Sequence, residues 1–193
     1  MRDGKVGFAI IGYGVIGPNH AKAITGAPDA ELIAVCDINP EREEKLRSDG
    51  YEVPFYKDYQ EMLKQEKDID VLNVCTYSGI HYESAVFAAN HGIHVLSEKP
   101  LDVTLDHMDQ MIDAADRNNV KLGCIFQRRT MRNSYLMKKA LEDGLLGKLI
   151  AGDCYQKYYR SPAYYKTAGW RGTWEFDGGG ALMNQAVHGI DLL

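Results

Sequence analysis

Short apolar runs alternate with longer, partly polar stretches over the first two-thirds of the chain. The apolar runs have the length and near-continuous hydrophobic character of strands buried on both faces, and they lie at 6–11, 31–36, 71–75, 94–96 and 121–126. The stretches between them predict helices ending near 26, starting at 39, around 58–64, at 80–91 and at 104–118. This alternation predicts an α/β fold in which helices cover both faces of a doubly wound parallel sheet.

Two of these helices carry clear local signals. Asn39 is placed to cap the charged helix, with Pro40 at its first position. In the helix at 104–118 the apolar residues recur at helical spacing, which predicts a buried face; they are Leu105, Met108, Met111, Ile112 and Ala115.

The pattern changes after Phe126. We expect a helix at 131–142, one long polar and aromatic strand at 149–159, and a last helix that Asp177 and three glycines open and that runs to the chain end. That helix carries apolar residues that need a partner surface: Leu182, Val187, Ile190, Leu192 and Leu193. Because little precedes it to cover this face, we expect the chain to be the N-terminal part of a longer polypeptide.

Composition narrows the class of protein. The 193 residues are 45% hydrophobic and 25% charged, with a net charge of −5, so nothing favours a nucleic-acid partner. The longest apolar stretches are too short to cross a bilayer, which argues against a membrane partner. The four cysteines form no CxxC pair and no zinc-ligand spacing, so we expect reduced thiols in a cytoplasmic protein without a metal site.

The first chemical signature is the glycine turn Gly12-Tyr13-Gly14-Val15-Ile16-Gly17. It follows a predicted strand and opens a predicted helix, the context that a dinucleotide-binding GxGxxG requires. Its glycines permit a tight turn, a close approach of the pyrophosphate and close packing of helix on strand.

Polar residues that follow later strands complete a predicted cofactor site. Asp37 lies 20 positions after Gly17, where a carboxylate accepts hydrogen bonds from ribose hydroxyls and repels a 2′-phosphate, so NAD is favoured over NADP. Thr76 follows the run at 71–75 and is a reasonable neighbour of the cofactor, because ligands bind at the carboxyl ends of parallel strands. His81 lies in the same loop, and a helix-capping or solvent-facing role is the open alternative.

Two further motifs carry reactive groups. Glu98, Lys99 and a following proline come directly after the run at 94–96, near the expected nicotinamide; the lysine can stabilise negative charge on a substrate oxygen, or it can be a plain surface lysine. Asn184 and His188 are four positions apart on the last predicted helix, so they share a face. A histidine there can accept a hydroxyl proton, although a structural histidine is the commoner case.

Basic and aromatic residues beyond 126 offer a possible substrate surface. Arg128 and Arg129 can pair with an anionic group or remain solvated. Residues 155–174 are rich in tyrosine, with Arg160 and Arg171 among them, and predict either a sugar pocket or an interface.

The order and spacing of four segments resemble the Gfo/Idh/MocA oxidoreductase family, named for glucose-fructose oxidoreductase and inositol dehydrogenase. The segments are the GYGVIG turn, CTYSGIHYESA, SEKP and GGGALMNQAVHGIDLL. The resemblance implies an NAD(P)-binding Rossmann domain at 1–126 and, at 127–193, the incomplete beginning of an α/β substrate domain built on an open sheet.

Residue roles follow from the resemblance position by position. Lys99 matches the active-site lysine of the family's EKP motif, and His188 matches its catalytic histidine. Gln127 matches a position near substrate or nicotinamide. Asn184 stands where the inositol dehydrogenase branch often has aspartate, so a charged pair between position 184 and His188 is ruled out and the substrate is not fixed.

The implied activity is oxidation of a secondary alcohol of a sugar, cyclitol or nucleotide-sugar by hydride transfer to the nicotinamide. The resemblance implies a small sugar or polyol substrate and a possible homo-oligomer of the full-length chain. Two alternatives stay open: a non-catalytic dinucleotide sensor or regulatory protein, and a truncated fragment that binds cofactor without turnover.

Overall fold

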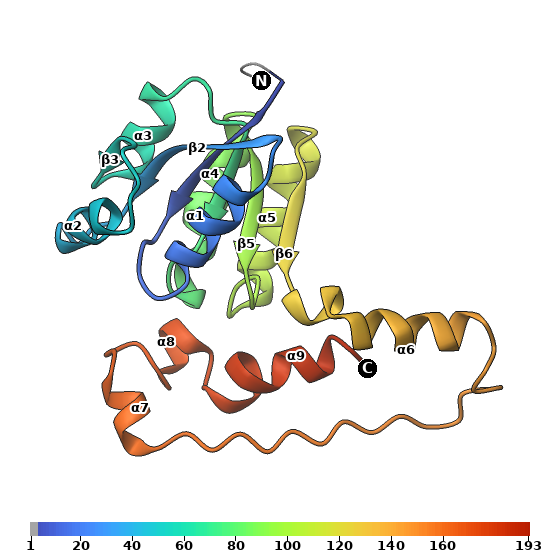
Figure 1. Cartoon of the computed structure of the whole chain (residues 1–193). Helices are drawn as coiled ribbons and strands as arrows, with labels where there is room; N and C mark the ends of the chain where they lie inside the picture. The colour runs from blue at the N-terminus through green and yellow to red at the C-terminus, as the bar shows by residue number, and fades with distance from the viewer. Residues whose placement is uncertain (1–3) are drawn as a thin grey trace. The chain divides into compact units, whose positions relative to one another are not determined.

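The computed structural model describes residues 4–193 and comprises two compact units (Figure 1). The first unit ends at Cys124 and the second begins at Ile125. The elements of the first unit alternate strand and helix along the chain, as the hydrophobic pattern predicts. In order they are β1 (Val6–Ile11), α1 (Gly17–Gly26), β2 (Ala30–Cys36), α2 (Glu41–Ser48), β3 (Phe55–Tyr56), α3 (Tyr59–Gln65), β4 (Val71–Val74), η1 (Ser78–Ile80), α4 (His81–Asn90), β5 (His94–Glu98), α5 (Leu105–Arg117) and β6 (Leu122–Ile125).

The six strands form one sheet in the order β3-β2-β1-β4-β5-β6. The strands from β3 to β5 pair in parallel, and the Val95 amide of β5 donates to the Lys121 carbonyl just before β6, at 2.8 Å. The order reverses between β1 and β4, so the connections that leave the carboxyl ends of these two strands run in opposite directions, which leaves a crevice for a ligand. The structure confirms the predicted doubly wound Rossmann sheet.

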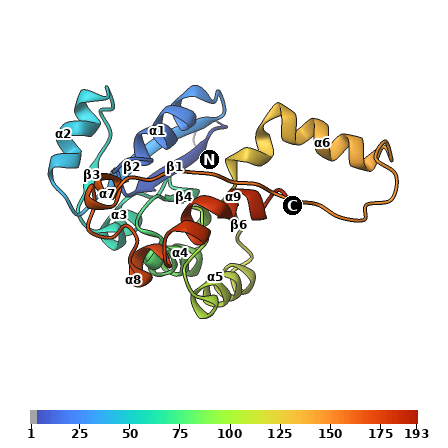
Figure 2. The same ribbon diagram turned by 90° about the horizontal axis from the view of Figure 1, so that it is seen from below.

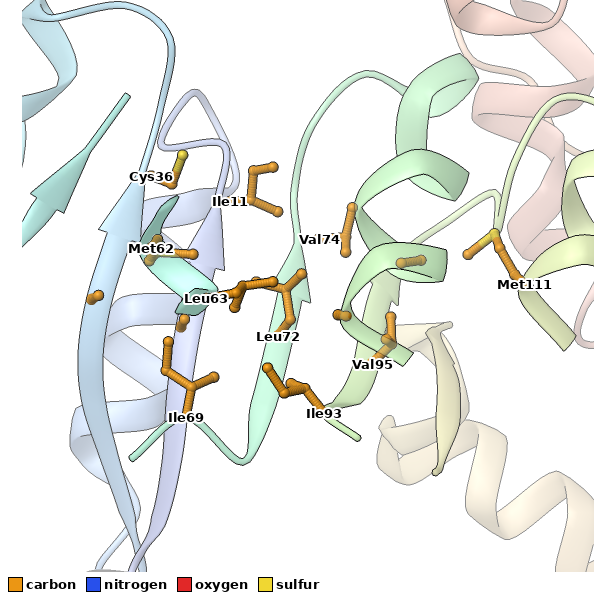
Figure 3. Close-up of a cluster of buried hydrophobic side chains, with 14 residues drawn as sticks. Ile11, Cys36, Met62, Leu63, Ile69, Leu72, Val74, Ile93, Val95 and Met111 are labelled. Atoms are coloured by element: carbon orange, nitrogen blue, oxygen red, sulfur yellow. The ribbon is translucent and has the colours of Figure 1, made fainter. Parts of the chain in front are cut away.

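Each face of the sheet carries its own apolar cluster because side chains alternate along a strand. On β1, Ala9 and Ile11 join the cluster beneath α3, α4 and α5, and Ile10 joins the cluster beneath α1 and α2. Figure 2 shows these two sets of helices on opposite faces of the sheet, and Figure 3 shows the larger cluster, with Leu72 and Val74 of β4 among its members. The apolar runs are therefore buried on both sides.

Side-chain caps explain where several helices begin. Asp58 accepts the Gln60 amide at 2.7 Å ahead of α3, and Thr104 accepts the His107 amide ahead of α5. Asn39 caps as predicted, accepting the Glu41 amide at 3.0 Å, although α2 begins at Glu41 and Pro40 lies just outside it.

The predicted apolar face of α5 is only partly buried. Met111 and Ala115 lie in the interior, whereas Leu105 is 75% exposed and Ile112 is 45% exposed. Leu105 is the first residue of the helix, just beyond its Thr104 cap.

The second unit contains short helices and a long irregular segment. Its elements are η2 (Gln127–Thr130), α6 (Arg132–Glu142), α7 (Pro162–Lys166), α8 (Trp174–Asp177), η3 (Ala181–Ala186) and α9 (Val187–Ile190).

One prediction for this unit is wrong. Residues 149–159 form no strand: they run as an extended trace in Figure 1, because no other segment among residues 125–193 offers a ladder of backbone hydrogen bonds. The predicted last helix is present, because residues 181–190 are helical without a break. It consists of a π-helical segment, η3, followed by the single turn α9, and its apolar residues Leu182, Ile190 and Leu193 are exposed.

Two cysteines lie within the apolar clusters of the first unit. Burial raises the pKa of the Cys36 thiol to about 12 and that of Cys75 well above its usual value, so both remain uncharged. Cys154, in the second unit, is exposed. From residue 4 onward, the structure contains no helix with the length and apolar character that crossing a bilayer requires.

Candidate functional site

The glycine turn joins β1 to α1, and each of its glycines is required for a different reason. Gly12 has φ +89°, and a Cβ there would lie 2.6 Å from the Cys75 carbonyl oxygen. A Cβ at Gly17 would lie 2.4 Å from the Gly12 carbonyl oxygen, so this glycine lets the helix start directly against the turn. At Gly14, no described atom lies within 4 Å of the position of a Cβ. The turn is thus closed on two sides and open at its middle glycine.

The remaining residues of the turn present their backbone rather than polar side chains. Tyr13 is fully buried, and its hydroxyl donates to Asp49 at 3.0 Å. Burial and the Asp49 carboxylate raise the pKa of Tyr13 well above its ordinary value, so the phenol stays a donor. Val15 is 84% exposed, and Ile16 directly precedes α1. The N-terminus of α1 carries no acidic residue in its first turn and is therefore suited to an anion.

Asp37 is held by the turn itself. One carboxylate oxygen accepts the Tyr13 amide at 2.7 Å, and the other accepts the Asn39 amide at 2.9 Å. Each carboxylate oxygen can accept a second hydrogen bond, so the group keeps capacity for ribose hydroxyls. The structure therefore brings the predicted ribose-binding carboxylate to the predicted phosphate turn.

Thr76 and His81 lie beyond the end of β4. The Thr76 hydroxyl oxygen is buried and has no hydrogen-bond partner among the described residues. The His81 ring is 1% exposed; its Nε2 faces the Thr76 carbonyl at 3.2 Å, and its Nδ1 faces the carbonyls of Pro100 at 3.1 Å and Leu101 at 3.2 Å. Burial lowers the pKa of His81 despite the opposing effect of these carbonyls. A neutral His81 thus links the loop after β4 to the turn after β5.

Glu98 ends β5 and turns its carboxylate inward. Its Oε1 lies 3.0 Å from His20 Nε2, and its Oε2 accepts the Lys99 amide at 3.2 Å. Burial alone would raise the pKa of Glu98, but the hydrogen bond from His20, together with Lys99, brings this pKa below its ordinary value. His20 also contacts the Asn73 amide through Nδ1, at 2.9 Å. Glu98 is therefore an ionised group whose carboxylate is committed to neighbours within the unit.

Lys99 is half-buried in the turn that follows β5, next to the cis peptide bond that joins it to Pro100. Both β4 and β5 are parallel strands, so Thr76 and Lys99 leave the sheet at the same edge. Sequence reasoning missed His20 and Asn73. Two features of the sequence could have identified them: Asn73 is a polar residue within an apolar strand, and His20 is a histidine near the start of the helix that follows the glycine turn.

Asn184 and His188 belong to the second unit. Asn184 lies in η3 and donates its amide to the Asp177 carboxylate at 2.5 Å. Asp177 is 2% exposed and also accepts the Gly172 amide at 2.7 Å. His188 is buried, with 9% of its surface exposed. The Asn184 side chain is uncharged, but it binds the carboxylate of Asp177, which the sequence analysis did not identify as a site residue.

The second unit also contains a cluster of guanidinium groups and aromatic rings. Arg171 lies 4.4 Å from the centre of the Tyr164 ring, and Arg160 lies 5.1 Å from the same ring. Arg160 donates to the Gln185 side chain at 2.9 Å. Both residues, together with Tyr165, help to line a hollow of about 260 Å³. The predicted cofactor residue Gln127 lies exposed at the start of η2.

The groups of the first unit fit a dinucleotide. The open space at Gly14 lies where a Cβ would obstruct a pyrophosphate, and the Asp37 carboxylate suits a ribose. The unpartnered Thr76 hydroxyl is a buried polar group that a ligand can satisfy. This arrangement can hold NAD.

Comparison with known proteins agrees with this geometry. Residues 6–126 match a family model described as an oxidoreductase family with an NAD-binding Rossmann fold, GFO_IDH_MocA, in agreement with the predicted cofactor. Residues 135–193 match the model of a GFO/IDH/MocA C-terminal domain.

Individual relatives point the same way. The chain is 33% identical over 141 residues to myo-inositol 2-dehydrogenase of Thermotoga maritima, covering 73% of this chain and 42% of that protein. It is 37% identical to the WlbA dehydrogenase from Bordetella pertussis, with a TM-score of 0.89 over 98% of this chain and 57% of that one. For the WlbA dehydrogenase from Chromobacterium violaceum the identity is 36% and the TM-score 0.86, over 100% and 55%. Both WlbA structures contain NADH and UDP-GlcNAcA.

The chain spans about half the length of the curated relatives it matches, for example 54% of D-glucoside 3-dehydrogenase of Escherichia coli. The two family models together cover nearly all of the described residues, and they match in the same order as the four sequence segments. The chain belongs to the Gfo/Idh/MocA family of oxidoreductases.

Proposed function

We propose that the protein containing this chain is an NAD-dependent dehydrogenase that oxidises a secondary alcohol of a sugar, cyclitol or nucleotide-sugar. The observation that carries the proposal is the Asp37 carboxylate, which the Tyr13 amide of the glycine turn holds at 2.7 Å. A carboxylate at this place accepts hydrogen bonds from both ribose hydroxyls and repels a 2′-phosphate, which favours NAD over NADP. In this proposal the turn from Gly12 to Gly17 receives the pyrophosphate, and Thr76 and Gln127 contact the cofactor.

The reaction needs one proton acceptor and one group that stabilises charge on oxygen. NAD, when bound, supplies the hydride acceptor. In this proposal His188 takes the proton of the substrate hydroxyl, and the Lys99 ammonium stabilises the negative charge that develops on oxygen. The C–H electron pair leaves as hydride and the O–H proton leaves to the histidine, so the alcohol carbon becomes a carbonyl. No other oxidant is required.

Asn184 has a supporting role in this proposal. The side-chain amide of Asn184 donates to the buried Asp177 carboxylate at 2.5 Å, and this contact also fixes the direction of the Asn184 side-chain oxygen. A fixed asparagine can orient His188 or a substrate hydroxyl, since both need a hydrogen-bond partner of defined direction.

Within this class we propose an acidic sugar derivative as the substrate. Arg160 and Arg171 lie against one tyrosine ring, and within the described part of the chain neither guanidinium forms an ion pair. Guanidinium groups suit carboxylates and phosphates because their paired donors match the geometry of these anions. The similarity to WlbA dehydrogenases, whose structures contain UDP-GlcNAcA, supports the same substrate class.

A substrate screen tests the proposal. The longest protein that the gene encodes is mixed with NAD and a panel of inositols, glucosides and UDP-linked uronates, and NADH formation is followed by absorbance. We expect turnover with at least one member, and a preference for the acidic members over neutral sugars of the same size. Lys99→Ala should abolish turnover while keeping most of the affinity for NAD.

Two outcomes would contradict the proposal. Tight NADH binding without turnover across the panel would favour a dinucleotide sensor. Equal loss of turnover and of NAD affinity in Lys99→Ala would give the lysine a structural role. The exposed Lys121→Ala variant is the control for removing a lysine from the first unit.

A further inference from the structure

We propose that His20 is a positioning residue for Lys99 and acts through the carboxylate of Glu98. The inference rests on the proposed role of Lys99 as the group that binds the substrate oxygen. It concerns three polar side chains, Asn73, His20 and Glu98, of which only Glu98 belongs to a motif that the sequence analysis identified.

The contacts run without a break from the centre of the sheet to the lysine. Asn73 on β4 contacts His20 Nδ1 at 2.9 Å, and His20 Nε2 contacts Glu98 Oε1 at 3.0 Å. The other oxygen of Glu98 accepts the Lys99 amide at 3.2 Å. With the Asn73 amide donating to Nδ1, the ring proton lies on Nε2 and points at the carboxylate. Each member of the chain therefore directs the next.

All three side chains of this hydrogen-bonded series are largely shielded from solvent. The side chains of His20 and Glu98 are 8% and 14% exposed, and Asn73 is 2% exposed. A buried pair of this kind adds little net stability compared with apolar side chains of similar size, because desolvation offsets most of its attraction. Its benefit must then be geometric: it fixes the direction of the Lys99 backbone.

The position of His20 makes that geometry useful. His20 lies one turn into α1, the helix that begins at the glycine turn. The pair with Glu98 thus connects the helix proposed to receive the pyrophosphate to the strand end that carries the lysine. On the other side of Lys99, His81 faces the Pro100 and Leu101 carbonyls. The lysine is flanked by two buried histidines, one acting on each side of its peptide.

Two substitutions at position 20 separate positioning from packing. His20→Leu keeps the volume but removes the donor to Glu98. His20→Gln keeps a donor close to the place of Nε2 and serves as the conservative variant. We expect kcat to fall about 10- to 100-fold in His20→Leu, as misplacement of a catalytic group by about 1 Å does, with NADH affinity within about threefold of wild type because the phosphate turn is untouched. His20→Gln should recover most of kcat.

A spectroscopic readout tests the same point without turnover. The lysines are reductively methylated with ¹³C-formaldehyde, and the dimethyl-lysine resonance that disappears in Lys99→Arg is assigned to Lys99. We expect this resonance to shift in His20→Leu and in Glu98→Gln. The resonance should stay in place in Leu46→Ala, a variant that opens a cavity in the apolar cluster beneath α2, to which Asn73, His20 and Glu98 do not belong.

Each result supports or overturns the inference. An unchanged Lys99 resonance with wild-type kcat in His20→Leu would overturn it, as would losses of kcat in His20→Leu and Leu46→Ala that simply follow their melting temperatures. If the wild type turns over no substrate while the resonance still responds to His20→Leu, the proposed function fails and the positioning of Lys99 stands.

Discussion

At the residue scale, the Asp37 carboxylate combines two tasks in one group. It accepts two backbone amides, those of Tyr13 and Asn39, and in the proposed function it also accepts the ribose hydroxyls. Loss of the carboxylate therefore acts on the ligand directly and on the turn that receives the pyrophosphate.

We predict that Asp37→Ala weakens NADH binding about 10- to 100-fold, since hydrogen bonds to a charged group contribute about 1.5–3 kcal/mol. The ratio of NADPH to NADH affinity should rise because repulsion of the 2′-phosphate is gone. Fluorescence titrations with both cofactors measure the effect. Glu41→Gln, an exposed carboxylate in the first turn of α2, is the control, and an equal loss in that variant would contradict the assignment.

A second prediction at this scale concerns pH. Burial lowers the pKa of His81, so the folded protein resists a proton that the unfolded chain accepts below its ordinary pKa of about 6.5. The unfolded state then binds more protons, and stability is lost as pH falls through and below about 6.5. We expect the melting temperature to fall between about pH 7.5 and pH 5 and the fall to be smaller in His81→Gln. A matched variant of the exposed His91, His91→Gln, should keep the wild-type acid dependence.

At the element scale, the glycine turn separates what folding needs from what the ligand needs. The space around Gly17 is filled by the protein's own backbone, whereas the space around Gly14 contains none of the described atoms. One methyl group added at each position therefore probes a different property.

We predict that Gly17→Ala destabilises the protein by about 1–3 kcal/mol, because its Cβ would meet the Gly12 carbonyl oxygen. Gly14→Ala should keep the wild-type melting temperature and weaken NADH binding. Gly26→Ala adds the same methyl group at the open C-terminal end of α1 and should change neither. Thermal unfolding and NADH titration distinguish the three variants. A normal NADH affinity in Gly14→Ala would contradict the assignment of the pyrophosphate site to this turn.

The segment η3 and the turn α9 owe their start to a buried acid. Asp177 binds the Gly172 amide and the Asn184 side chain, and it is 2% exposed. We predict that Asp177→Ala destabilises the second unit by about 1–3 kcal/mol, because two partly buried donors lose their acceptor. Hydrogen exchange of the amides of 172–190 measures it. The exposed Glu175→Ala variant next to it should leave this exchange unchanged.

At the scale of the whole molecule, the first unit holds both apolar clusters. Every member of the two clusters lies between Phe8 and Leu122. We predict that residues 1–126 expressed alone fold cooperatively and bind NADH, as measured by circular dichroism and fluorescence titration. A fragment that aggregates or remains unfolded would show that the clusters need the rest of the chain.

The same division explains which predictions from sequence were correct. Five of the six strands are nearly continuous apolar runs, so the hydrophobic pattern identified them, and their alternation with helices indicated a parallel sheet. The sequence analysis did not identify β3, which is only two residues long. The polar and aromatic residues 149–159 predicted a strand, but a strand exists only when another strand pairs with it, and the residue pattern carries no information on that partner. Among site residues, Asp37 and the glycines have local signatures. His20 and Asp177 acquire their roles from contacts 78 and 7 positions away, which spacing alone does not specify.

The two amides that hold Asp37 have a consequence for engineering cofactor preference. A change to a small neutral residue at this position leaves the Tyr13 and Asn39 amides to seek other acceptors. A redesign for NADP must therefore bring in a replacement acceptor, for example serine, together with a cation for the added phosphate at the neighbouring position, where Ile38 is already 83% exposed. Cofactor preference therefore depends on positions 37 and 38 together. We expect single substitutions to give proteins that bind both cofactors weakly rather than proteins that prefer NADP.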